Sequence, residues 1–202
     1  MSTALVVAAV PAERDAIVAA GCSGPVIVGG VGPAESAART SAALAAGSFD
    51  LVLCAGIGGG FAPLVPGEVA VASAIVFADL GAATPEGFVP VSGLGFGAER
   101  YPVAPALAVR LADRAGGRLG TILTVATVTG SAAAADALVA RFPDAVAEGM
   151  EGAGVAAAAT VHGVAFGELR AISNSVGPRD REAWQIPRAL EALGRAVAAV
   201  IG

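Results

Sequence analysis

The sequence contains no lysine: all twelve basic residues among its 202 are arginine. A Walker A phosphate-binding loop, a Schiff-base enzyme and a pyridoxal-phosphate site each require a lysine, so the composition excludes all three. The chain also has a single histidine, His162, and only two cysteines, Cys22 and Cys54. This supply argues against a zinc site built from His and Cys side chains. We therefore expect neither a metal ion nor a cofactor.

Charged residues are also few, at 14% of the chain, with a net charge of −5. The arginines form no basic stripe, so a nucleic acid is not an expected partner. Hydrophobic residues make up 55%, which excludes disorder and indicates a large buried core. Aromatic residues contribute only 4%, so Ala, Val, Leu and Ile must fill that core. Such an apolar chain predicts an apolar subunit contact and hence a homo-oligomer, a dimer or higher.

No segment resembles a membrane span or a targeting sequence. The apolar run at residues 4–10 is short, lacks a basic start and stops at Pro11, so we interpret it as a first buried strand. No uninterrupted apolar run reaches membrane-spanning length, and we expect no membrane association. Cys22 and Cys54 are interpreted as buried free thiols rather than a disulfide, which indicates a cytoplasmic protein.

Apolar runs of strand length alternate with segments of helical periodicity along the chain. The expected strands lie at residues 4–10, 25–31, 50–55, 69–77, 118–127, 145–150 and 165–173, and the expected helices at 12–20, 33–46, 104–115, 131–141, 152–161 and 186–201. Residues 79–97 should form a loop or hairpin, and residues 174–185 a polar loop. The alternation predicts one α/β domain, residues 1–202, with a mostly parallel, mixed central sheet flanked by helices.

Unusual residues follow four of the expected strands. Glu13 comes after the first, a glycine-rich segment at residues 56–60 after the third, Glu151 after the extended segment and Asn174 after the last. The carboxyl ends of parallel strands meet at one edge of a sheet, where such sheets bind ligands. Two carboxylates, an amide and a glycine floor suit a sugar substrate. Carboxylates stabilise the oxocarbenium-like state of glycosidic cleavage and can activate the attacking water.

Each candidate also has a plain structural explanation. A carboxylate at Glu13 or Glu151 complements a helix dipole, Asn174 can cap a turn, and the glycines can form only a tight turn. Trp184 either packs against the fold or forms a lid over a base or acyl ring. Arg179 either belongs to a solvated loop or contacts an anionic group of the substrate. The spacing alone leaves these alternatives open.

Six short segments match motifs of one enzyme superfamily. They are Ala-Val-Pro-Ala-Glu at 9–13, Gly-Val-Gly at 30–32, Gly-Ile-Gly-Gly-Gly at 56–60, Arg-Phe-Pro at 141–143, Gly-Met-Glu-Gly-Ala-Gly at 149–154 and Arg-Ala-Ile-Ser-Asn at 170–174. Through them almost the whole chain resembles the nucleoside phosphorylase/nucleosidase superfamily, which includes methylthioadenosine/S-adenosylhomocysteine nucleosidase. The tail at residues 173–180 is similar to that of the futalosine hydrolase family within it.

The resemblance implies a nucleoside phosphorylase-like fold and a small-molecule nucleoside substrate. It implies hydrolysis of the N-glycosidic bond of futalosine, with release of hypoxanthine, in menaquinone biosynthesis. By position, Glu13 matches the carboxylate that activates the water, Met150 the residue under the ribose, and Glu151 the acceptor of the ribose hydroxyls. The substrate-binding set completed on this basis is Gly56, Ile57, Gly58, Met150, Glu151, Arg179 and Trp184.

Asn174 departs from the pattern of adenine-specific nucleosidases, which carry an aspartic acid there. An amide can donate to N7 or to a 6-oxo group, so Asn174 favours hypoxanthine over adenine. Because an amide cannot supply a proton as a carboxylic acid does, Asp180 or water is the expected proton source for the leaving base. The catalytic set is thus Glu13, Asn174 and Asp180.

Two other functions remain as alternatives. No Arg immediately precedes Gly56, and the Glu13 segment replaces the phosphate loop of the superfamily's phosphorylases. This favours water over phosphate as the nucleophile, but a phosphorolytic enzyme or a nucleosidase for aminodeoxyfutalosine or methylthioadenosine stays an alternative. The other alternative is a non-catalytic nucleotide-binding protein.

Overall fold

The computed structural model describes residues 3–202 as an α/β fold in which strands and helices alternate. The strands are β1 (Ala4–Ala8), β2 (Val26–Val28), β3 (Leu51–Gly60), β4 (Val69–Phe77), β5 (Gly81–Thr84), β6 (Gly87–Pro90), β7 (Arg100–Pro102), β8 (Arg118–Thr124), β9 (Ala145–Gly149) and β10 (Ala165–Ser175). The helices are α1 (Pro11–Ala19), α2 (Pro33–Ala46), α3 (Pro105–Ala115), α4 (Ala132–Arg141), α5 (Gly152–His162), the short 3-10 helix η1 (Arg181–Ala183) and α6 (Ile186–Ile201).

The main sheet has eight strands in the order β10-β4-β8-β9-β3-β1-β2, with β7 added beside β4. Most neighbouring pairs are parallel; β3–β9, β4–β10 and β4–β7 are antiparallel. A further pairing joins β10 to β3, so β3, β10, β4, β8 and β9 close into a ring. The predicted mostly parallel, mixed sheet is confirmed.

β3 is the central strand, and its glycines let it change partners. On one edge of β3, the first half of the strand pairs with β1, and Gly59 and Gly60 pair with β9. On its other edge, β3 pairs with β10 along its whole length. A Cβ atom at Gly58 would lie 2.5 Å from the Glu148 carbonyl oxygen, so only glycine permits this close approach. Our prediction that the strand ends before residue 56 is therefore wrong, because pairing with β10 overrides the local preference of glycine for turns.

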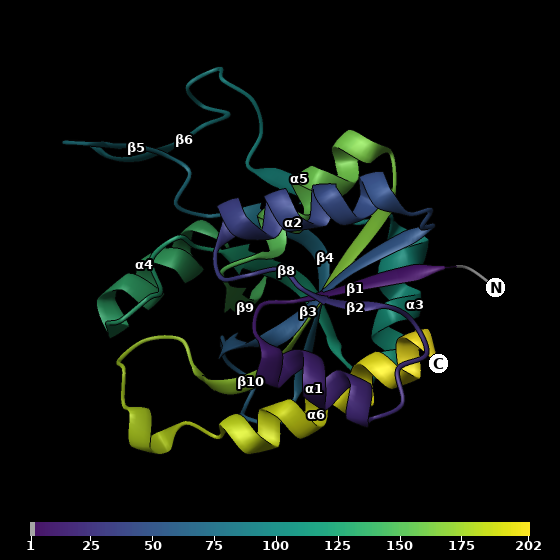
Figure 1. The fold of residues 1–202 in the computed structure, drawn as a ribbon. Coiled ribbons are helices and arrows are strands. Elements are labelled where there is room, and N and C mark those ends of the chain that lie inside the picture. The colour runs from purple at the N-terminus through teal and green to yellow at the C-terminus, as the bar shows by residue number, and fades with distance from the viewer. Residues whose placement is uncertain (1–2) are drawn as a thin grey trace.

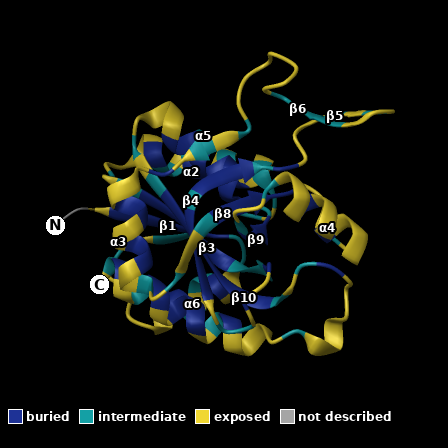
Figure 2. Cartoon of the chain, turned by 180° about the vertical axis from the view of Figure 1, so that it is seen from behind, coloured by how far each residue is buried: buried dark blue, intermediate teal, exposed yellow. Residues whose placement is uncertain are grey.

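Helices cover both faces of the sheet (Figure 1). α2 and α5 lie together on one side, whereas α1 and α6 lie together on the other with α3 beside α6. One apolar cluster joins the strands to α1, α3 and α6, a second lies between β1, β3, α2 and α5, and a third lies under α4. The buried strands and the exposed outer faces of the helices are clear in Figure 2. Residues 79–97, predicted as a loop or hairpin, contain the antiparallel hairpin of β5 and β6, which projects from the rest of the fold (Figure 1).

Several boundaries match the prediction, namely those of α2, β4 and α6. β10, however, runs two residues beyond the predicted end and includes Asn174 and Ser175. These two residues pair with Gly59 and Gly60 of β3, which extends the strand past a polar sequence that looks like the start of a loop. Asn174 is therefore fixed by a strand rather than by a turn.

Candidate functional site

A cavity of about 290 Å³ lies where β1, β3, β9 and β10 end, and it gathers most of the predicted site residues. Those that line it are Glu13, Ile57, Gly58, Met150, Glu151, Asn174, Arg179 and Trp184. The wall also includes residues that were not predicted, among them Thr129, Glu148, Arg170 and Ser173. Gly56 and Asp180 are not part of the wall.

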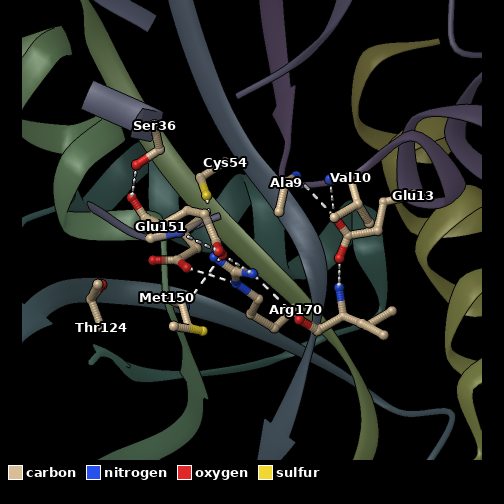
Figure 3. Close-up of polar contacts among 12 residues, drawn as sticks. Ala9, Val10, Glu13, Ser36, Cys54, Thr124, Met150, Glu151 and Arg170 are labelled. Carbon is tan, nitrogen blue, oxygen red and sulfur yellow. Dashed lines mark hydrogen bonds and ion pairs between the residues drawn. The ribbon is translucent and has the colours of Figure 1, made fainter. Parts of the chain in front are cut away.

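Glu13 is held at the start of α1 with its carboxylate buried. One oxygen, Oε2, accepts hydrogen bonds from the backbone N–H groups of Ala9 (2.8 Å) and Val10 (3.2 Å). Within the described part of the chain the other oxygen, Oε1, accepts one hydrogen bond, from the Ile57 N–H at 2.8 Å (Figure 3). Oε1 thus keeps a free lone pair. Burial raises the pKa of Glu13, and the nearby Arg170 guanidinium and the N–H groups of Ile57 and Ala9 oppose that rise.

Glu151 stands between β9 and α5 and is also buried. Its Oε1 accepts from the Gly32 N–H at 3.2 Å, and its Oε2 accepts from the Met150 N–H at 3.3 Å. Oε2 also forms an ion pair with Arg170 Nη1 at 2.9 Å. The carbonyl of Glu151 accepts from the Ser36 hydroxyl, which ties the start of α5 to α2. The carboxylate is therefore fixed from three sides.

Arg170 forms ion pairs with Glu151 and Glu168, lies near Glu13 and is only 2% exposed. Its Nε donates to Glu168 Oε1 at 2.8 Å, Nη1 reaches the Ile57 carbonyl at 3.3 Å, and Nη2 contacts Cys54 Sγ at 3.4 Å. Three buried glutamates thus surround one guanidinium. Arg170 was predicted only as part of a motif, and Glu168 was not predicted. The signal was available: opposite charges two residues apart in an apolar strand share one face.

Gly56 lies behind the cavity rather than in its wall. A Cβ atom there would be 2.8 Å from both Glu13 Oε1 and Arg170 Nη1. Any side chain would push these groups away from the strand, so Gly56 permits the close approach of the carboxylate and the guanidinium.

Asn174 and Glu148 supply polar groups at another part of the wall. Asn174 Oδ1 accepts from the Ser173 hydroxyl at 2.7 Å, and its Nδ2 donates to the Ser175 carbonyl at 2.9 Å. This leaves one N–H and one lone pair of the amide for a ligand. Glu148, which sequence analysis did not single out, accepts from both the N–H and the hydroxyl of Thr129.

The rim of the cavity is formed by the segment after β10. The guanidinium of Arg179 lies 5.1 Å from the ring centre of Trp184, and the guanidinium of Arg181 lies 5.7 Å from the same ring centre. Both arginines are exposed. Asp180 is exposed and accepts from the Glu182 N–H at 3.3 Å, so it caps η1 and does not reach the cavity. The predicted supply of a proton by Asp180 therefore has no geometric support.

Within residues 3–202, no group of three or more His, Cys, Asp or Glu side chains is arranged to hold a metal ion. None of the helices described is long and apolar enough to cross a membrane. Both cysteines are free thiols, as predicted; Cys54 is buried and Cys22 half-buried.

Comparisons with known proteins agree with this geometry. A phosphorylase superfamily profile matches residues 16–202. The futalosine hydrolase of Streptomyces coelicolor is 56% identical over 85% of this chain and 75% of its own length. That of Acidothermus cellulolyticus is 46% identical over 97% of this chain and 89% of its own.

Solved structures confirm the fold. The native structure of futalosine hydrolase of Helicobacter pylori superposes with a TM-score of 0.84 at 19% identity, covering 99% of this chain and 97% of that one. A 5'-methylthioadenosine/S-adenosylhomocysteine nucleosidase from Neisseria meningitidis, in complex with methylthio-immucillin-A, also gives 0.84, at 18% identity over 100% and 99%. With the profile and the two relatives, these matches show that the chain belongs to the phosphorylase superfamily and, within it, to the futalosine hydrolase family.

Proposed function

We propose that this protein hydrolyses the N-glycosidic bond of futalosine and releases hypoxanthine, a step of menaquinone biosynthesis. The observation that carries the proposal is a pair of buried carboxylates in one cavity that also presents the amide of Asn174. Backbone N–H groups hold Glu13, and the Arg170 guanidinium pairs with Glu151. Relatives at 56% and 46% identity that are named futalosine hydrolase support the choice of substrate.

Glu13 and Glu151 have different roles in the reaction. Glu13 Oε1, with its free lone pair, accepts the proton of a water that attacks the anomeric carbon. Glu151 accepts hydrogen bonds from the ribose hydroxyls and stabilises the positive charge that develops on the sugar. Because backbone N–H groups fix both carboxylates, little reorganisation is needed during the reaction. Met150 packs under the ribose between them.

The leaving base is stabilised without a protein acid. The Asn174 amide donates a hydrogen bond to the base, but it cannot transfer a proton. With Asp180 outside the cavity wall, water supplies the proton to the departing hypoxanthine. At the rim, Trp184 covers the acyl ring of futalosine, and Arg179 pairs with its benzoate carboxylate.

The charge of the site supports water over phosphate as the nucleophile. Arg170 already contacts Glu151, Glu168 and the Ile57 carbonyl. Three carboxylates against one guanidinium leave this part of the cavity wall without a free cation for a phosphate dianion. The direct test is base release in phosphate-free buffer and with added phosphate. A rate that is independent of phosphate supports hydrolysis, and release only with phosphate would make the protein a phosphorylase.

Replacing Asn174 with aspartate should shift the preference toward 6-amino substrates. A carboxyl at this position can protonate N7 and accept from the exocyclic amine of adenine, whereas it repels a 6-oxo group. We expect the ratio of kcat/KM for futalosine to that for aminodeoxyfutalosine to fall by about 10-fold or more. Unchanged selectivity of Asn174→Asp would remove Asn174 as a reader of the base.

On the acidic side of the pH–rate profile, the rate should fall at a higher pH than the pKa of an exposed glutamate would give. Glu13 must be ionised to accept a proton, so the rate falls as pH falls through its pKa, which burial raises. The pH profile of kcat for futalosine checks this, because kcat reports the ionisations of the enzyme–substrate complex. Glu13→Gln should lack this acidic limb, whereas Glu191→Gln, which changes an exposed glutamate of α6, should keep it. A limb that persists unchanged in the residual activity of Glu13→Gln would show that Glu13 does not set it.

The proposal also includes a homo-oligomer in the cytoplasm. Phe96 on the loop after β6 and Val161 on α5 are 81% and 82% exposed, which supports an apolar subunit contact. Two free thiols suit a reducing compartment. The mass in solution at low protein concentration tests the oligomer.

A further inference from the structure

We propose that Glu148 selects a 6-oxopurine together with Asn174, by accepting a hydrogen bond from the N1–H group of the base. The inference rests on the proposed function, since it names how that same site chooses its base. No role for Glu148 follows from the chemistry of bond cleavage described above.

Strand register places Glu148 opposite Asn174. Both residues pair with Gly59, Glu148 from β9 and Asn174 from β10. Two strand spacings separate their backbones, which is about 10 Å. Val176 lies against Gly59, where a Cβ atom would be 2.8 Å from its Cγ2. The wall therefore presents an apolar floor with one polar side chain on either side, as a flat purine with polar edges requires.

Glu148 is a buried carboxylate that has no cationic partner among the described residues 3–202. It is 6% exposed, and its hydrogen bonds within residues 3–202 both come from Thr129, one to each oxygen. The charged neighbour that acts on it is Asp79, which has the same sign. Burying an unpaired carboxylate costs desolvation free energy, and these two hydrogen bonds offset only part of it. Each oxygen keeps a lone pair for a donor in the cavity.

Hypoxanthine and adenine differ at the atom that would meet this carboxylate. The N1 atom of a 6-oxopurine carries a hydrogen and donates, whereas N1 of adenine has a lone pair and accepts. A carboxylate therefore attracts the first base and repels the second. Sites that hydrogen-bond a substrate group reject an analogue lacking it by large factors, because their own polar groups are then left unpaired.

The test compares futalosine with aminodeoxyfutalosine in the wild type and in Glu148→Gln. A glutamine can turn its amide and offer an N–H to N1 of adenine, so the ratio of the two kcat/KM values should fall by about 100-fold. Glu99→Gln is a matched control: Glu99 likewise accepts from the N–H and the hydroxyl of one residue, Ser92, but lies outside the cavity. It should keep the wild-type ratio. A fall of both rates of Glu148→Gln by the same factor, with the ratio unchanged, would overturn the inference.

A second measurement does not depend on turnover. Calorimetric titration of the wild type with free bases should show binding of hypoxanthine and at least 10-fold weaker binding of 1-methylhypoxanthine, which lacks the N1 hydrogen. Glu148→Gln should lose this difference. If the enzyme fails to cleave futalosine but distinguishes the two bases through Glu148, the proposed function fails and the inference stands. Equal binding of the two bases by the wild type would overturn the inference even with futalosine hydrolysed.

Discussion

The variant Glu13→Gln is expected to lose about 10³-fold in kcat/KM for futalosine, within the range that a general base contributes. A glutamine amide cannot take the proton of the attacking water. It also presents an NH₂ group to backbone N–H groups that now donate to Glu13. The rate of hypoxanthine release measures the loss, and the far-ultraviolet circular dichroism spectrum should match that of the wild type.

A matched change away from the cavity separates the base from a general effect of the substitution. Glu191→Gln alters an exposed glutamate of α6 that pairs with Arg195, and it should keep the wild-type rate. Near-normal turnover by Glu13→Gln would contradict the role of Glu13 in activating water.

Replacing Arg170 with methionine should have the largest effect on stability. It leaves Glu13, Glu151 and Glu168 buried together without a counter-charge, and breaking a buried ion pair in this way costs about 3–5 kcal/mol. At roughly 2–4 °C per kcal/mol for a chain of this size, the Tm should fall by about 10 °C. Thermal unfolding followed by circular dichroism measures the shift.

Arg195→Met is the control for this change. Arg195 makes a single ion pair with Glu191 on the exposed face of α6, where such pairs contribute little. Its Tm should stay within about 2 °C of the wild type. An Arg170→Met protein as stable as Arg195→Met would show that the three carboxylates do not depend on the guanidinium.

Local sequence predicts the elements whose signals are local. Pro33 at the start of α2 and the periodic apolar face of α6 fix these helices, and both have the predicted bounds. The glycines of residues 56–60 were wrongly predicted to lie outside the strand, because their conformation is set by pairing with β9 and β10, which lie far along the chain. The same long-range pairing carries Asn174 into β10.

The residues of the site likewise fall into those that the local sequence reveals and those that it does not. Glu13 and Glu151 could be singled out because each stands where a strand gives way to a helix, and both line the cavity. Three charged residues inside strands were not predicted, because the role of such a charge depends on the residues that face it across the sheet. They are Glu148, Glu168 and Arg170. Asp180 was included because it lies near Asn174 in sequence, yet the turn after β10 directs it to the surface.

Hydrolysis of futalosine is tested most directly by measuring the release of free base from futalosine, aminodeoxyfutalosine and inosine in phosphate-free buffer. We expect hypoxanthine from futalosine, at a rate that added phosphate does not change, and little release from the other two nucleosides. Release that requires phosphate, or adenine release from aminodeoxyfutalosine as the faster reaction, would contradict the account. Binding without release from any of the three would make this protein a nucleoside-binding member of the fold rather than an enzyme.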